Sequence, residues 1–157
     1  MSTSIVLENE EIKKKIIGTL GLKESDVKPR ERDKGMFTFD ALIRKGIPYA
    51  KVAIVKTALN LSDSEFAAYL GISLRTLQRK RNSQGKLSIA EGDRLFRIAK
   101  IFALASHVLE DDEMARKWLH RHQRGLGGRV PIQVIQTEAG AQEVEDLLEK
   151  IEYGVLI

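Results

Sequence analysis

The stretch from Ser62 to Arg81, SDSEFAAYLGISLRTLQRKR, constrains the fold of this chain more than any other. Ser62 followed three residues later by Glu65 has the spacing of a capping box and predicts a helix start. Gly71 stands where the chain must turn, because glycine reaches left-handed backbone angles without the cost of a β-carbon. Ser73 then predicts the N-cap of a second helix. Two short helices joined at a glycine form the helix-turn-helix pattern.

The two predicted helices divide their side chains between the core and the surface. Phe66, Ala67 and Leu70 form the apolar stripe of the first helix, and we expect Leu74 and Leu77 to point inward from the second. Arginine, glutamine and hydroxyl groups can donate to base edges and phosphates. The second helix and its cap supply the predicted DNA-binding residues, which are Ser73, Arg75, Thr76, Gln78, Arg79 and Arg81.

Lys80 departs from the pattern. A helix-turn-helix usually carries an apolar residue three positions after the one that Leu77 represents, and this chain has Lys80 there. We therefore expect Leu87 or Ile89 to help anchor the second helix. A purely structural helix-turn-helix, serving assembly rather than DNA binding, remains an alternative.

Composition limits the class of protein. The 157 residues are 43% apolar and 31% charged, which is typical of one or two small globular domains. No run of 18 apolar residues is present, and the N-terminus has acids where a signal peptide is basic, so we expect a cytoplasmic protein that does not span a membrane. The absence of cysteine excludes disulfides, thiolate chemistry and cysteine-bound zinc. The three prolines and few aromatic residues favour an all-α fold.

Charge is distributed unevenly along the chain. No acidic residue lies between Glu65 and Glu91, whereas five cations do. Near the C-terminus the sign reverses, and six acids accompany the single cation Lys150. We expect this basic centre and acidic tail to contact two different partners, with a solvated helix face as the alternative for each. Three cations of the following helix could also touch a phosphate backbone, although we expect them to be solvated by default: Arg94, Arg97 and Lys100.

The remaining pattern is helical throughout. An apolar stripe at Ile12, Ile16, Ile17 and Leu20 predicts a helix packed on the outside of the core. Pro48 is expected as the first residue of a scaffold helix. That helix has the apolar face Val52, Ile54, Val55, Ala58 and Leu59.

Two longer helices and a turn complete the chain. A helix opens after Ser88, and Trp118 is expected to anchor a small core. A turn at Gly127 and Gly128 precedes a last helix that begins at Glu138. Its inward residues are Ala141, Val144, Leu147, Leu148 and Ile151.

No catalytic or metal-binding constellation emerges. His120 and His122 are two residues apart, and on a helix that spacing does not bring both rings to one face. The pair Gly127 and Gly128 lacks the preceding strand that a phosphate-binding loop requires. We expect neither an enzyme nor a cofactor or metal site.

Five motifs, taken together, resemble the Xre/MbcA/ParS-type antitoxins of bacterial RES–Xre type II toxin–antitoxin systems. The resemblance runs from about residue 45 to the end. It rests on the order of LGISLRTLQRKR (70–81), GKLSIAEGDRLFRIAKI (85–101), the WL pair (118–119), LGGRVPIQVI (126–135) and TEAGAQEVEDLLEKIEYGVL (137–156).

The helical stripe and the polar, turn-rich stretch that follows it predict an accessory N-terminal helical segment (1–40), which lies outside the resemblance. The resemblance implies a helix-turn-helix DNA-binding domain (41–90) and a C-terminal toxin-binding domain (91–157). It also implies that the protein blocks a RES-type toxin that consumes NAD and, as a complex, represses its own operon. The toxin-binding candidates that follow are Leu126, Gly127, Gly128, Arg129, Glu149, Glu152, Tyr153, Gly154, Val155 and Leu156.

The residues themselves point to a partner at the C-terminus. An acidic helix that leads to the apolar end Val155-Leu156-Ile157 suits insertion into a cleft. If that cleft binds a dinucleotide, Glu149 or Glu152 could imitate phosphate charge. The tail could instead fold back on its own core.

Two further expectations concern assembly and function. A lone recognition helix reads few bases, so specific DNA binding implies a homodimer that presents two helices about 34 Å apart. The alternative function is a helix-turn-helix transcriptional regulator whose C-terminal region dimerises or senses a ligand.

Overall fold

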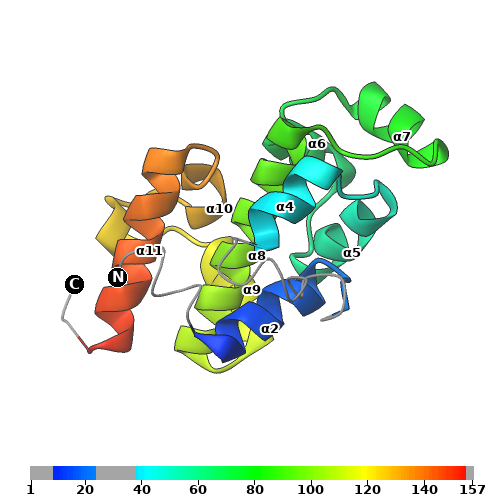
Figure 1. Cartoon of the computed structure of the whole chain (residues 1–157). Coiled ribbons are helices and arrows are strands. Elements are labelled where there is room, and N and C mark those ends of the chain that lie inside the picture. Colours follow the sequence, from blue (N-terminus) through cyan, green and yellow to red (C-terminus); the bar gives the residue numbers. More distant parts are fainter. Residues whose placement is uncertain (1–8, 24–37, 155–157) are drawn as a thin grey trace. The chain divides into compact units, whose positions relative to one another are not determined.

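The described parts of the chain fold into helices joined by turns and loops (Figure 1). The computed structural model describes residues 9–23 and 38–154. The helices are α2 (Glu10–Thr19), α4 (Thr38–Lys45), α5 (Ala50–Ala58), α6 (Asp63–Leu70), α7 (Leu74–Asn82), α8 (Ile89–Leu109), α9 (Asp112–Leu119), the 3₁₀ turn η2 (Arg124–Leu126), α10 (Pro131–Val134) and α11 (Glu138–Glu152). In these described ranges the β pairing consists of isolated bridges at Pro48–Lys86 and Gln123–Arg129. The predicted all-α class is confirmed.

The described residues form two compact units. Residues 17–23 and 38–96 make the unit that contains the helix-turn-helix, which we call the HTH unit. Residues 9–16 and 97–154 make the other, which we call the C-terminal unit. The boundaries fall within α2 and α8. No helix of the described chain is long and apolar enough to cross a membrane.

The core of the HTH unit collects apolar side chains from each of its helices. Val55, Leu59, Phe66, Leu77 and Leu95 have no accessible surface. Complete burial of each such side chain contributes roughly 1.5–3 kcal/mol to folding. The predicted stripe of α6 and the buried members of the α5 stripe therefore form the core that supports α7.

Two expectations for α5 are wrong. The helix begins at Ala50 rather than at Pro48, which pairs with Lys86 in an isolated bridge before the helix. Ile54 is 41% exposed rather than buried.

The C-terminal unit is built around the second part of α8 and around α11. Ile98, Ala99 and Ile101 of α8 are completely buried, as are Val144 and Leu148 of α11. Helix α11 packs against η2 and α10, and α10 packs against α9. Trp118 on α9 is only half-buried, so it anchors the core with part of its surface.

The predicted N-terminal stripe is confirmed as the buried face of a helix. Ile12, Ile16 and Leu20 are at most 1% exposed, and Ile17 is 8% exposed. Glu11, Lys14 and Gly18 are exposed, so α2 buries its apolar face and presents its other face to solvent, as a helix packed on a core does. Residues 1–8, 24–37 and 155–157 lie outside the described residues, together with what the sequence predicts for them.

Candidate DNA-contacting and partner-binding surfaces

The first helix of the helix-turn-helix begins and ends as its sequence predicts. The Ser62 hydroxyl accepts the Glu65 amide at 3.1 Å, and the Glu65 carboxylate accepts the Ser62 amide at 2.8 Å, which completes the capping box. Gly71 adopts a left-handed φ of 74° and ends α6. A β-carbon at Gly71 would lie 2.5 Å from the Arg94 guanidinium, so both the backbone and the space favour glycine here.

The second helix is fixed by a cap and by one fully buried leucine. The Ser73 hydroxyl accepts the Thr76 amide at 3.0 Å and lies 2.8 Å from the Thr76 hydroxyl. Leu77 is completely buried, and Ala67 of α6, at 1% exposure, allows the two helices to pack together. The predicted helix-turn-helix is therefore confirmed.

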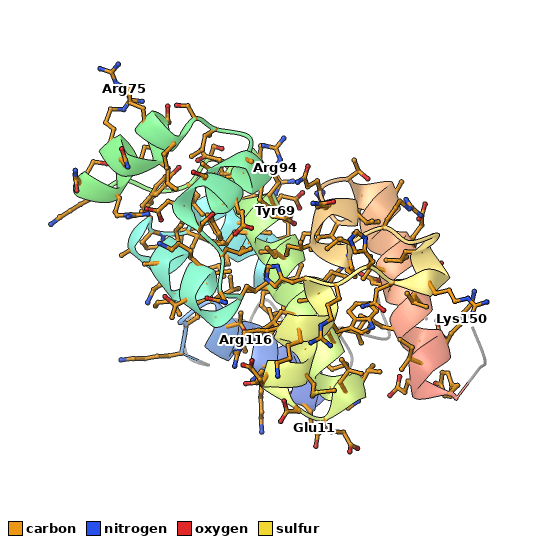
Figure 2. All side chains as sticks on the ribbon, turned by 180° about the vertical axis from the view of Figure 1, so that it is seen from behind. Glu11, Tyr69, Arg75, Arg94, Arg116 and Lys150 are labelled. Carbon is orange, nitrogen blue, oxygen red and sulfur yellow. The ribbon has the colours of Figure 1, made fainter. Side chains whose placement is uncertain are left out.

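Three of the six predicted DNA-binding residues have side chains that are free in the described chain, and the other three form bonds within the protein. Arg75, Gln78 and Arg79 are exposed, and within the described chain their side chains bond to no other group. Figure 2 shows Arg75 extending away from α7 into solvent. The Ser73 and Thr76 hydroxyls instead form the hydrogen bonds of the helix cap.

Arg81, the sixth predicted DNA-binding residue, is paired within the chain. Its guanidinium lies 2.8 Å from the Asp63 carboxylate, which also accepts the Lys56 ammonium at 2.5 Å. Hydrogen bonds from Arg81 and Lys56 lower the pKa of Asp63 to about 2. Asp63 therefore remains ionised and ties the end of α7 to the start of α6.

Leu74 does not point inward, and that expectation is wrong. Its side chain is 39% exposed at the first position of α7. Successive helical residues are about 100° apart, so Leu74 lies roughly 60° around the helix from Leu77. Leu77 is the one residue of α7 that is buried, so only a narrow face of this helix packs on the core. Leu74 lies outside that narrow face, at the edge of the exposed one.

Lys80 anchors α7 through a polar network in place of the usual apolar contact. Its ammonium donates to Glu91 at 3.0 Å and lies 5.2 Å from the centre of the Tyr49 ring. The Tyr49 hydroxyl also donates to Glu91, whose carboxylate accepts the Ser88 amide at 3.2 Å. Of the two substitutes expected from the sequence, Leu87 is buried, whereas Ile89 is 55% exposed and does not serve.

The titration of this network follows from its geometry. Burial raises the pKa of Glu91, but hydrogen bonds from Tyr49, Lys80 and Ser88 outweigh burial and hold that pKa below its usual range. Burial and the bond to Glu91 raise the pKa of Tyr49. Glu91 is thus a carboxylate that accepts three donors at the joint between α7 and α8.

The three cations of α8 are used inside the protein. Arg94 donates to the Leu70 carbonyl at 2.7 Å and so satisfies the end of α6. Arg97 donates to Glu138 at 3.2 Å. Lys100 forms an ion pair with Glu145 at 2.7 Å, and the two side chains are only 6% and 2% exposed. The expectation that Lys100 could touch phosphate is wrong, because this pair is closed to solvent.

In the C-terminal unit, a closed turn carries the first set of predicted toxin-binding residues. Gln123 and Arg129 pair their backbones, and Gly127 and Gly128 adopt left-handed φ values of 66° and 83°. Leu126 is 3% exposed and so contributes little to the surface of this turn, which is formed by Arg124, by the glycines and by Arg129. The Arg129 guanidinium donates to the Leu126 carbonyl at 2.7 Å and to Glu143 of α11.

The acids of α11 are largely satisfied by their own chain. Glu138, Glu143 and Glu145 pair with Arg97, Arg129 and Lys100. Glu152 lies 3.4 Å from the His107 ring. The cations that neutralise the tail come from earlier parts of the chain, so the predicted acidic surface is weaker than the sequence indicates.

The end of α11 carries the second set of predicted toxin-binding residues. Tyr153 is 70% exposed, and Gly154 has a left-handed φ of 68° where the helix ends. Glu149 is half-buried. Val155 and Leu156 lie outside the described residues.

A shallow pocket that sequence reasoning missed joins the turn to α11. It has a volume of about 180 Å³ and is lined by Gly125, Leu126, Glu143, Asp146, Leu147 and Lys150. The last four have the spacing i, i+3, i+4, i+7, which could have identified them as one helix face. Figure 2 shows Lys150 pointing away from α11.

Other clusters of the C-terminal unit lie apart from these surfaces. A pocket of about 630 Å³ is lined by residues of α2, α8 and the start of α9, among them Lys15, His107 and Asp112, and by none of the predicted toxin-binding residues. His122 lies 2.8 Å from the Gly128 carbonyl and so helps to hold the glycine turn. In the parts of the chain described, no group of three or more His, Asp or Glu side chains could hold a metal ion.

Comparison with known families matches both units. Residues 38–100 match the antitoxin Xre-like helix-turn-helix domain. Residues 104–154 match the antitoxin Xre/MbcA/ParS C-terminal toxin-binding domain. The two matches follow each other with a gap of three residues.

Curated relatives bear the same description. An "Antitoxin Xre" of Photorhabdus laumondii is 27% identical over 118 residues, which cover 74% of this chain and 80% of that protein. One of Pseudomonas putida is 36% identical over 83 residues, covering 53% of this chain and 52% of that protein. One of Yersinia enterocolitica is 29% identical over 114 residues, covering 72% and 77%.

Proposed function

The chain belongs to the Xre-type antitoxins, and we propose that it binds and blocks a RES-type toxin that consumes NAD and that the complex represses its own operon. The observation that carries the proposal is the succession of two family domains, an Xre-like helix-turn-helix at 38–100 and a toxin-binding domain at 104–154. The protein acts by binding, and the NAD chemistry belongs to the toxin.

DNA binding is assigned to the exposed face of α7. Arg75, Gln78 and Arg79 can reach base edges and phosphates without breaking a bond within the described chain. One helix of nine residues reads few bases, so operator binding uses a homodimer or a toxin-bridged assembly with two copies of α7 about 34 Å apart. Replacing one cation that neutralises a phosphate reduces the slope of log affinity against log salt by about 0.9.

Toxin binding is assigned to the glycine turn and to the end of α11. Both surfaces belong to the C-terminal unit. The glycine turn exposes backbone beside Arg129, and the end of α11 exposes the ring of Tyr153, which Val155 and Leu156 follow in the sequence. Tyrosine and apolar side chains are the groups that anchor protein interfaces. Glu149 lies about two turns before the tail and Glu152 about one, so both would approach the rim of the toxin cleft.

The test is co-expression with the product of the adjacent reading frame. The wild-type protein should co-purify with that product and should preserve cellular NAD. A chain that lacks Val155 to Ile157, or that carries Tyr153→Ala, should bind the toxin at least about tenfold more weakly, so that the toxin again consumes cellular NAD. If these variants neutralise the toxin fully, the tail does not bind it.

A second variant separates the two activities. Arg75→Ala/Arg79→Ala leaves the C-terminal unit untouched, so it should neutralise the toxin as well as wild type does. It should bind the DNA upstream of its gene with a salt slope lower by about 1 to 2. An unchanged slope would indicate a helix-turn-helix that serves assembly rather than DNA.

A further inference from the structure

We propose that Leu74 is a specificity-determining residue that reads the C5-methyl group of a thymine in the operator. This inference rests on the proposed DNA binding by α7. It starts from the exposure of Leu74, which the spacing from Leu77 had predicted to point inward. Its apolar side chain is 39% exposed on the helix that carries Arg75 and Arg79.

The N-terminal turn of α7 offers few groups for base reading. Recognition helices contact base edges mainly with their N-terminal residues. In α7 the Ser73 and Thr76 hydroxyls are bonded to each other, and Ser73 also accepts the Thr76 amide. Leu74 and Arg75 are therefore the side chains at this end that are free to meet a base.

The chemistry of the major groove then selects the partner of each. Thymine alone presents a methyl group there, and guanine presents the two acceptors O6 and N7 that arginine binds as a pair. An exposed leucine gains from covering a methyl group and gains nothing from a polar base edge. Leu74 and Arg75 are adjacent in the chain, so the half-site should contain a thymine next to a guanine.

The described HTH unit contains two comparable exposed aliphatic side chains, and neither lies on α7. Ile54 of α5 lies against Gly21, where a β-carbon would be 2.3 Å from its Cδ1 atom. Ile89, 55% exposed, begins α8. Ile89 is therefore a matched control: a substitution there removes exposed apolar surface without touching the recognition helix.

The experiment is a two-by-two comparison of protein and DNA. Wild type and Leu74→Ala are titrated against the DNA fragment upstream of the gene, made either with thymine or with deoxyuridine, which lacks the C5-methyl group. A buried methyl group is worth about a fourfold change in affinity, so two half-sites give roughly fifteenfold. Wild type should bind the uridine fragment more weakly by about that factor, and Leu74→Ala should be nearly indifferent to the replacement.

Each other outcome overturns the inference. If uridine weakens the binding of wild type and of Leu74→Ala by the same factor, the methyl group is contacted by another residue. The same result is expected if Leu74 acts in dimerisation instead of base reading. Loss of the penalty in Ile89→Ala, with retention in Leu74→Ala, assigns the contact to α8. If wild type, with or without the toxin, does not bind the thymine fragment at all, operator binding itself fails, which distinguishes that failure from the failure of Leu74.

Because Leu74 is exposed, its replacement by alanine should leave folding intact, and circular dichroism with a urea midpoint checks this. Single thymine-to-uridine replacements across the protected region then locate the methyl group. The sensitive position should be next to a guanine whose replacement affects wild type but not Arg75→Ala.

Discussion

The ion pair between Lys100 of α8 and Glu145 of α11 gives the sharpest test of how the C-terminal unit is held together. The two side chains are 6% and 2% exposed, and their charged atoms are 2.7 Å apart. Glu145→Leu leaves the Lys100 ammonium buried without this carboxylate. Removing one partner of a buried pair costs about 3–5 kcal/mol, because the remaining charge is no longer compensated.

A double variant should recover this stability. Lys100→Met/Glu145→Leu removes both charges and replaces them with apolar groups of similar size. Such replacements are neutral or stabilising by about 1–4 kcal/mol in buried pairs. The double variant should therefore be at least as stable as wild type, and far more stable than Glu145→Leu.

A matched control is available on the same helix. Glu143 pairs with Arg129, but these side chains are 50% and 55% exposed, and Glu143→Ala should cost at most about 1 kcal/mol. Urea unfolding followed by circular dichroism measures all four proteins. Equal destabilisation by Glu145→Leu and Glu143→Ala, or a double variant no better than Glu145→Leu, would refute this account of the pair.

Three further predictions concern other parts of the molecule. Lys80→Met keeps a long side chain but removes the cation beside the buried Glu91 carboxylate, so it should lower the free energy of unfolding in urea by about 1–3 kcal/mol. An unchanged free energy would mean that this network does not anchor α7. Because the pKa of Asp63 is lowered to about 2, its contribution to stability is present above about pH 4 and is lost as the pH falls towards 2. Asp63→Asn, which weakens the tie to Arg81, should therefore show a smaller change in urea midpoint than wild type between pH 5 and 2, and parallel curves would contradict this. Gly140→Ala would place a β-carbon 1.8 Å from the Val134 carbonyl oxygen and should lower the free energy of unfolding by more than about 3 kcal/mol. Gly127→Ala has a strained positive φ but open space around the β-carbon, and it should cost about 1 kcal/mol. Similar melting temperatures for the two variants would show that the carbonyl can move.

Local features of the protein could be predicted from its sequence because their causes are local. The capping box at Ser62 and Glu65, the left-handed Gly71 and the cap at Ser73 each depend on residues within one helical turn. The apolar stripes of α6 and α11 follow from the helical period. The order of the motifs was also enough to indicate the antitoxin family.

The partners of the charged residues could not be predicted in this way. Lys80 meets Glu91 and Lys100 meets Glu145 across 11 and 45 positions of the chain, and no local pattern encodes such distances. The sequence presents α11 as an acidic surface, and only the packing of α8 and the glycine turn against it supplies the neutralising cations. The missed constraint at Gly140 has the same origin, since it arises from the close approach of the preceding helix.

Leu74 shows where the division lies. Its spacing from Leu77 is compatible with both burial and exposure, because three residues bring a side chain back to within about 60° of the same direction. Whether that angle faces the core depends on how wide a face of α7 the rest of the HTH unit covers. Local chemistry therefore determines that α7 is a capped helix with a cationic face, and tertiary packing determines which of its side chains remain exposed.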